Sequence, residues 1–258
     1  MVLSYSFCNV AVLPLRREPT HSSEQVSQML FGEKAEVLEI NEKEWAKVRI
    51  AWDNYTGWCK VSQLSLAQKK EYNKEAKYLV GKQGDKLIFD ESEMILPLGA
   101  DLMKSKLIVG KQTGKFKGKK LEINKLSFDC NNIKHFAMLY LHSPYQWGGR
   151  SMAGIDCSGL TQMVFKLCNR RLPRDASQQA EEGEAVDFLQ HAKCGDLAFF
   201  DNPDGRINHV GILFDNQTII HATDAAGRVV VDKIDQGGII STMLRKRTHS
   251  LRMVKRYQ

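Results

Sequence analysis

The 258-residue sequence predicts small all-β barrels followed by an α+β domain. Residues 33–64 contain the short alternating runs KAEVLEI, WAKVRIAW and YTGWCKV, separated by turn signals, which is typical of a small barrel. Residues 132–141 and 154–167 carry the apolar spacing of amphipathic helices. The β-rich runs GDLAFF, NHVGILF, TIIHAT and RVVVDKI come after them. Helices packed on such an antiparallel sheet make an α+β domain.

Changes in composition divide the chain into four segments. Residues 1–66 are expected to form the first barrel, and the charged run AQKKEYNKEAKYL predicts a linker helix over residues 67–79. Residues 80–126 have weaker β patterning and are expected to form a second barrel. Residues 127–258 then form the α+β domain. Its first helix should bury Ile133, Phe136, Ala137, Tyr140 and Leu141 on one face.

The net charge of +7 is concentrated in the lysine-rich segment Lys104–Lys125 and in a second basic group near the C-terminus. Such charge could attract nucleic acid, a membrane surface or a wall polymer, but a solvated basic face is the favoured interpretation. No nucleic-acid-binding motif accompanies the charge, and no apolar run reaches the roughly 18 residues of a membrane span. We therefore expect neither a nucleic-acid partner nor a membrane span.

The six cysteines lack C-x-x-C spacing, which argues against a zinc site and against a dense disulfide framework. Five of them are expected to be small buried hydrophobic residues. Unpaired thiols favour a reducing compartment, and the N-terminus has no basic leading region or cleavage site. A cytoplasmic location is therefore expected. The alternative is a periplasmic or exported protein from which a signal peptide has been removed.

The stretch GIDCSGLTQMVFKL, residues 154–167, predicts a reactive cysteine at the start of a helix. Asp156 is a favoured N-cap residue, so Cys157 should lie in the first turn. Free backbone N–H groups and the helix dipole there favour an anion, and the thiolate is the nucleophilic form of cysteine. The pattern indicates a nucleophile.

A cysteine nucleophile needs a histidine base, and that base needs an orienting group. His209 opens one predicted strand and His221 closes the next, with the turn signal DNQT between them. A hairpin centred on Asp215 would make the two histidines direct cross-strand partners on one face. His21, His191 and His249 lie in polar surroundings and are expected at the surface. A structural role for the paired histidines is the alternative to a Cys-His-His site.

The motifs PYQWGGRSMAGIDCSGL, LPRDASQQA, GDLAFF, NHVGIL and IIHA resemble, in this order, those of the NlpC-type cell-wall cysteine peptidases. The resemblance covers residues 133–256 and implies a papain-like catalytic domain. It implies Cys157 as the nucleophile, His209 as the general base and His221 as the orienting residue. Tyr145 would help the Cys157 backbone N–H to stabilise the oxyanion. Trp147, Asp156 and Ser158 would contact substrate.

The N-terminal runs LRREPTHSSEQVSQMLFGE and YTGWCKVSQL resemble the bacterial SH3-like domain of the dipeptidyl-peptidase branch of this family. This resemblance implies hydrolysis of the γ-D-glutamyl–diamino acid bond in peptidoglycan-derived peptides that begin with a free L-Ala. Glu33 and Tyr55 are the implied contacts of that free amine, with turn chemistry in the barrel as the alternative. The resemblance implies no cofactor or metal, and we expect a monomer.

The mechanism implied is attack by a Cys157 thiolate paired with a His209 imidazolium, followed by hydrolysis of a thioester. Two other functions remain open. One is a wall-peptide-binding scaffold with an inert peptidase domain, although the presence of all three residues argues against it. The other is a transpeptidase or acyltransferase that uses the same cysteine. The sequence also leaves open meso-diaminopimelate or lysine on the leaving side.

Overall fold

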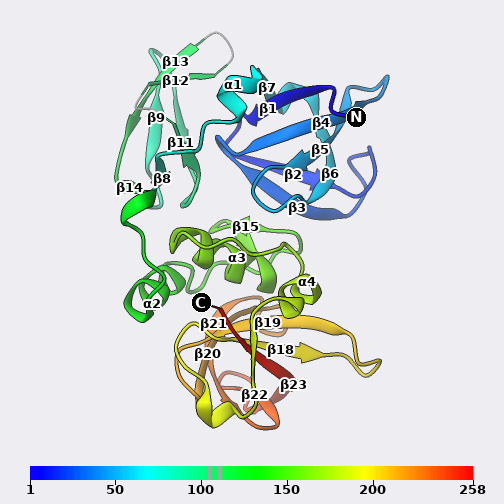
Figure 1. The fold of residues 1–258 in the computed structure, drawn as a ribbon, viewed down its shortest axis with the longest axis vertical. Helices are drawn as coiled ribbons and strands as arrows, with labels where there is room; N and C mark the ends of the chain where they lie inside the picture. The colour runs from blue at the N-terminus through cyan, green and yellow to red at the C-terminus, as the bar shows by residue number, and fades with distance from the viewer. Residues whose placement is uncertain (104–105, 110–111, 258) are drawn as a thin grey trace. The chain divides into compact units, whose positions relative to one another are not determined.

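The computed structural model describes residues 1–103, 106–109 and 112–257, with the backbone alone for residues 106–108. Two compact units divide the chain, and Figure 1 shows the elements of each. The first unit contains Met1–Leu126 together with Gly148–Met152. The second contains Ser127–Trp147 and the remainder of the chain from Ala153. Lys104, at the start of the lysine-rich segment, lies outside the described residues.

The first unit is all β and begins with a curled SH3-like sheet, ordered β3-β2-β6-β5-β4-β1-β7. Alternate residues of its strands face an apolar core that includes Leu13, Leu15 and Val48. The expected β pattern of residues 33–64 is therefore confirmed. The strands are β1 (Ser4–Cys8), β2 (Val12–Arg16), β3 (Gln25–Leu30), β4 (Lys34–Ile40), β5 (Trp45–Ile50), β6 (Thr56–Lys60) and β7 (Leu64–Ala67).

The predicted linker helix is wrong in length, because α1 covers only Lys69–Tyr72. Charged helix-forming residues alone do not sustain a helix that buries no apolar face, and α1 has no buried residue. Two small sheets follow, ordered β10-β9-β13-β12 and β11-β8-β14, and among the described residues neither pairs with a strand of the second unit. Their strands are β8 (Tyr78–Val80), β9 (Lys86–Ile88), β10 (Glu93–Ile95), β11 (Asp101–Leu102), β12 (Lys106–Val109), β13 (Gln112–Lys117) and β14 (Lys120–Glu122).

A buried ion pair joins the barrel to the segment Gly148–Met152, which also belongs to the first unit. Arg150, in β15 (Arg150–Ser151), places two guanidinium nitrogens 2.8 and 3.0 Å from the carboxylate oxygens of Glu33. Both side chains are essentially inaccessible to solvent. The Leu30 N–H also donates to Glu33 at 2.8 Å, and the Gln28 carbonyl accepts from Arg150 at 2.6 Å. Burial of these charges is tolerated because each has several partners.

We predict that Arg150→Met lowers the free energy of unfolding of the first unit by about 3–5 kcal/mol, because it leaves the buried Glu33 carboxylate without its cation. Urea unfolding followed by tryptophan fluorescence measures the effect. Arg17→Met is the matched control, because Arg17 forms an exposed ion pair with Glu24, and its expected cost is under about 1 kcal/mol. Equal costs for the two variants would contradict the prediction.

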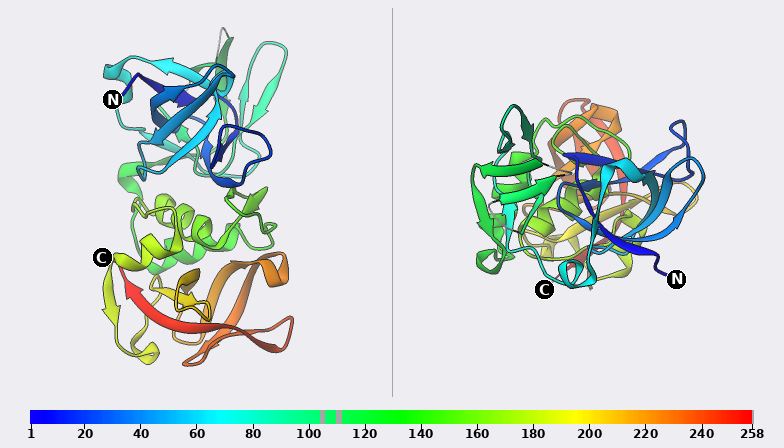
Figure 2. Two further views of the ribbon diagram at one scale, coloured as in Figure 1. Left: turned by 90° about the vertical axis from the view of Figure 1, so that its right-hand side faces the viewer. Right: turned by 90° about the horizontal axis from the view of Figure 1, so that it is seen from above.

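The second unit is built on a seven-stranded antiparallel sheet, ordered β17-β23-β18-β19-β20-β21-β22. Strand β23 also pairs with β22, so six of the strands close into a ring around residues such as Phe200, Leu213 and Ile239. Figure 2 shows this sheet in yellow to red. The strands are β16 (Gly154–Ile155, outside this sheet), β17 (Glu184–Val186), β18 (Leu197–Asp201), β19 (Ile207–Leu213), β20 (Thr218–Thr223), β21 (Arg228–Asp235), β22 (Gly238–Ser241) and β23 (Lys246–Arg256).

Three helices complete the second unit: α2 (Cys130–Leu139), α3 (Cys157–Leu167) and α4 (Ala176–Glu181). Helix α3 packs against β19 and β20, and every one of its residues is buried. The expected buried face of the first helix is confirmed at Ile133, Phe136 and Ala137. Within the described part of the chain, no helix combines the length and the apolar character needed to cross a membrane.

The expectation for the cysteines is wrong at two positions. Cys130, at the start of α2, forms a disulfide with Cys194 in the loop before β18. Cys130 is exposed and Cys194 half-buried, so neither is a small core residue. Sequence reasoning missed this pair because the two residues lie 64 positions apart and only the fold brings them together. Cys8, Cys59 and Cys168 are free and buried, as expected.

Candidate active site

Cys157 is the first residue of α3, as the sequence predicts. Asp156 adopts an extended conformation and caps the helix, with its carboxylate accepting from the Gly159 N–H at 2.7 Å. Cys157 is 6% exposed and its sulfur is hydrogen-bonded by the backbone of Val210, next to His209 on β19. The start of α3 therefore lies against the backbone of β19 at the residue that follows the first histidine.

Asp156 and Ser158, the predicted substrate contacts, are held by a buried arginine that sequence analysis did not single out. Arg174 places its terminal nitrogens 3.0 and 2.6 Å from the two Asp156 carboxylate oxygens and 2.8 Å from the Ser158 hydroxyl. All three side chains are buried. The ion pair between Arg174 and Asp156 fixes the start of α3, because a bidentate arginine restricts the carboxylate in both distance and orientation. Arg174 lies in the motif LPRDASQQA, so this motif was the sequence signal that could have identified it.

The predicted hairpin register is wrong by two residues. Ile212 pairs with Ile220 and Leu213 with Ile219, which centres the hairpin one residue after Asp215. The turn closes through the Phe214 N–H and Thr218 carbonyl at 2.9 Å. His221 therefore lies opposite Gly211 rather than His209. A slip of two residues preserves the face of a strand, so both histidines still point to the same side.

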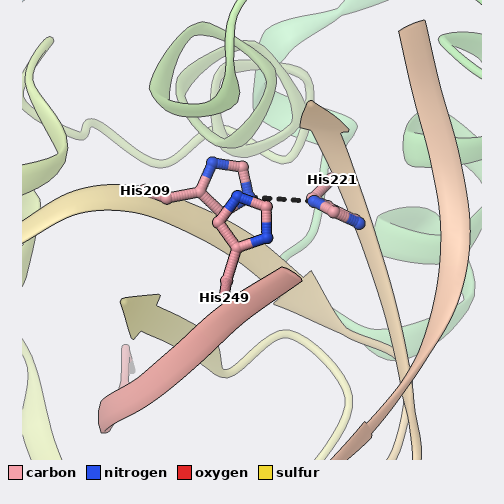
Figure 3. A group of neighbouring side chains, drawn as sticks. All are labelled: His209, His221 and His249. Carbon is pink, nitrogen blue, oxygen red and sulfur yellow. Dashed lines mark hydrogen bonds between the residues drawn. The ribbon is translucent and has the colours of Figure 1, made fainter. Parts of the chain in front are cut away.

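His209 lies two residues from the position opposite His221, so the two histidines are diagonal neighbours on adjacent strands. They form a hydrogen bond between Nε2 of His209 and Nδ1 of His221 at 2.8 Å (Figure 3). Gly211 makes room for it, because a Cβ at this position would lie 2.7 Å from the Ile219 side chain and 3.0 Å from the His221 Cβ. Both imidazoles are buried. Behind them, Asp232 of β21 lies 3.2 Å from Nε2 of His221.

His249 is the third imidazole of the group and was wrongly expected at the surface. It comes from β23 and is stacked on His209, with ring centroids 4.0 Å apart and an angle of 19° between the planes (Figure 3). Nitrogen atoms of the three histidines lie within 4.8 Å of one another, close enough to be considered as metal ligands. Stacked rings direct their in-plane lone pairs side by side, so convergence on one ion would require His249 or His209 to rotate.

The buried environment favours the neutral forms of both reacting groups. Burial, reinforced by the Asp156 carboxylate, raises the pKa of Cys157 to about 12 against the opposing Val210 and Ser158 backbone groups and Arg174. Burial, with His221 and His249 adding to it, lowers the pKa of His209 well below its ordinary value. This direction is opposite to the expectation from the helix terminus, because desolvation outweighs the dipole.

Tyr145 is half-buried beside the thiol, and its backbone N–H donates to the Gly227 carbonyl at 2.9 Å. Burial, followed by the nearby Cys157 and Asp156, raises the pKa of its phenol. The hydroxyl consequently remains protonated at neutral pH and can donate a hydrogen bond. Trp147, the predicted cleft residue, is 59% exposed.

Glu33 and Tyr55 belong to the first unit. The Glu33 carboxylate is engaged by Arg150 and by a turn N–H, and Tyr55 packs half-buried against the barrel core. These contacts correspond to the structural alternative stated for both residues. A role in binding the peptide amine remains a prediction.

The fold and the site define a papain-like cysteine peptidase. Residues 142–248 match the NlpC/P60 family, and residues 15–64 match the bacterial dipeptidyl-peptidase SH3 domain. The chain thus carries a bacterial SH3 domain followed along the sequence by an NlpC/P60 domain, and the resemblance noted in its motifs is confirmed.

Two relatives and one crystal structure illustrate what the chain is similar to. A gamma-D-glutamyl-L-lysine dipeptidyl-peptidase of Bacillus subtilis (strain 168) is 29% identical over 76% of this chain and 71% of its own length. Dipeptidyl-peptidase 6 of Lysinibacillus sphaericus is 26% identical over 86% of this chain and 89% of its own. The crystal structure of an NlpC/P60 family protein from Bacillus cereus ATCC 10987 covers 98% of this chain and 99% of its own, with a TM-score of 0.82 at 20% identity.

The histidine cluster makes stability depend on pH. Burial, with His221 as the next cause, lowers the pKa of His249 to about 4, so the folded state prefers the neutral ring. As the pH falls from 6.5 to 4, the unfolded chain binds this proton first and stability decreases. We predict that His249→Phe, which keeps an aromatic ring against His209, reduces this acid-induced loss by about 1–2 kcal/mol after allowance for the partial exposure of His249.

Urea unfolding of the wild type and His249→Phe at pH 7 and pH 4.5 measures this difference. His191→Phe is the control, because His191 is exposed at the end of the short 3₁₀ helix Leu189–His191. An equal loss of stability in wild type and His249→Phe would show that His249 does not contribute.

Proposed function

We propose that this chain hydrolyses the γ-D-glutamyl–diamino acid bond of peptidoglycan-derived peptides and releases L-Ala-γ-D-Glu. The observation that carries the proposal is the buried Cys157 at the start of α3, whose sulfur is bonded by the backbone of Val210, the residue after His209, together with the hydrogen bond between His209 and His221. The relatives named gamma-D-glutamyl-L-lysine dipeptidyl-peptidase supply the substrate class. We further propose that the enzyme acts as a monomer.

In the proposed mechanism, the Cys157 sulfur attacks the γ-carbonyl of D-glutamate while its proton passes to Nδ1 of His209. The Cys157 N–H and the Tyr145 hydroxyl donate to the resulting oxyanion, and loss of one such donor typically costs about 10²–10³ in rate. His209 then protonates the amine of the departing diamino acid, and the C–N bond breaks to leave a thioester. Water, deprotonated by His209, adds to the thioester carbonyl and releases the dipeptide with its new carboxylate.

Glu33 and Tyr55 are the residues proposed to bind the free N-terminal amine of the peptide substrate. A buried carboxylate is the group expected to bind a desolvated ammonium ion, and its loss is costly for that ligand. The Arg150 contact does not prevent this role, since a carboxylate offers about four acceptor sites.

We predict that the wild type releases L-Ala-γ-D-Glu from L-Ala-γ-D-Glu-meso-diaminopimelate and that Cys157→Ala reduces the rate by at least about 10³, because the thioester cannot form. Mass spectrometry identifies the products, and the lysine-containing peptide tests the leaving side. Cys168→Ala is the matched control, because Cys168 is a free buried thiol at the C-terminal end of the same helix. Cleavage that survives in Cys157→Ala would exclude this nucleophile.

Acetylation of the peptide N-terminus tests amine recognition separately. The acetylated peptide should be cleaved at least about 10²-fold more slowly than the free peptide. Tyr55→Phe should reduce the ratio of the cleavage rate of the free peptide to that of the acetylated peptide. The ratio is informative because partial misfolding lowers both rates together. An added amine acceptor distinguishes hydrolysis from transpeptidation, since a transpeptidase would yield the amide of L-Ala-γ-D-Glu.

We keep the cytoplasm as the proposed location and the periplasm or cell exterior as its alternative. The Cys130–Cys194 disulfide favours the alternative, because such bonds persist mainly in oxidising compartments. The two locations predict opposite thiol states for this pair in living cells. Rapid alkylation of producing cells, followed by peptide mass spectrometry, measures that state: two alkylated cysteines support the cytoplasm, and an intact bond supports export.

A further inference from the structure

Asp232 is a buried carboxylate that the Cys-His-His description does not use. It lies on β21 and is 4% exposed. One oxygen lies 3.2 Å from Nε2 of His221, and the other accepts from the Thr242 N–H at 2.7 Å. Burial opposes ionisation, but the hydrogen bonds from His221 and Thr242 outweigh it and lower the pKa of Asp232. Asp232 is therefore an anion that can only accept hydrogen bonds.

The charge of Asp232 determines the tautomer of His221. A neutral imidazole carries one N–H, and an acceptor beside Nε2 selects the tautomer with the proton on Nε2. Nδ1 of His221 is then an acceptor, so the 2.8 Å contact requires Nε2 of His209 to donate. His209 consequently keeps its lone pair on Nδ1, the nitrogen that Figure 3 shows pointing away from His221. That nitrogen is the one available to take the thiol proton.

We propose that Asp232 is a positioning residue, the last member of a directed chain His209–His221–Asp232 that leaves the basic lone pair of His209 on Nδ1, the nitrogen that is not bonded to His221 and is free to accept the Cys157 proton. The expected effect on the reaction rests on the proposed function. The directions of the hydrogen bonds do not, because they depend only on residues of the second unit. The titratable groups around His221 come from three strands: His209 on β19, Asp232 on β21 and His249 on β23, whose ring centroid is 5.7 Å away.

The substitution Asp232→Asn reverses the chain of donors. The Thr242 N–H requires the amide oxygen of Asn as its acceptor, which leaves the amide NH₂ facing Nε2 of His221. His221 would then carry its proton on Nδ1 and donate to His209, whose own proton would move to Nδ1. The base would present an N–H to the thiol instead of a lone pair.

The test compares wild type, Asp232→Asn and Asp235→Asn. Asp235 is the matched control, because it lies three residues further along β21, is exposed, and pairs with Arg247 rather than with a histidine. We expect Asp232→Asn to lower kcat on the free tripeptide by about 10²–10⁴, as the corresponding change does in Ser-His-Asp enzymes, with KM changed less than about threefold. Asp235→Asn should retain wild-type kcat.

Alkylation of Cys157 by iodoacetamide gives a readout that needs no peptide. The wild-type rate should vary little between pH 6.5 and pH 9, because neutral His209 assists throughout; the Asp232→Asn rate should rise about tenfold per pH unit, as solvent must remove the proton. The ring ¹⁵N resonances of His221 should report Nε2–H in the wild type and Nδ1–H in the variant. A flat alkylation profile in Asp232→Asn, or an unchanged tautomer, would overturn the proposal.

Two further outcomes remain interpretable. If no tripeptide is cleaved but the alkylation profiles differ as expected, the proposed substrate is wrong and the role of Asp232 stands. If Asp232→Asn fails to fold, Asp232→Glu keeps a carboxylate in the chain and should retain the flat profile and the Nε2–H tautomer. A steep profile in folded Asp232→Glu would count against the proposal.

Discussion

The site depends on the hydrogen bond between His209 and His221, and this bond depends on the register of β19 and β20. The residue opposite His221 is Gly211, and a Cβ there would lie 3.0 Å from the His221 Cβ, so the glycine leaves room for the diagonal pair. The bond gives one buried imidazole a polar partner and orients it at the same time.

Around this bond, several buried polar groups form connected sets. Arg174 holds Asp156 and Ser158 at the start of α3, while Asp232 and Thr242 continue the line from His221. An unpaired polar group would be costly at this depth, so each member restricts its neighbour. These hydrogen bonds hold the side chains in a defined arrangement, which is what the proposed attack on a peptide carbonyl requires. Burial also favours the neutral forms of the Cys157 thiol and the His209 imidazole.

Local sequence patterns were sufficient for the elements that carry the site. Asp156 as a cap and Cys157 in the first turn were predictable, because capping and helical periodicity involve residues within four positions of one another. The short alternating strands of the barrel were predictable for the same reason. The charged segment after the barrel was not, because α1 lacks an apolar face and helix propensity alone extends it for only one turn.

The sequence by itself determined which residues could react: a capped cysteine, two strand histidines on one face, and the order of motifs that relates the chain to NlpC/P60 peptidases. Tertiary structure alone decided their partners. The two-residue shift in register, the stacking of His249 on His209, the Asp232 contact and the Cys130–Cys194 disulfide all join residues on different elements. Such contacts depend on where a turn closes and how strands are ordered in a sheet, and no local pattern encodes those distances.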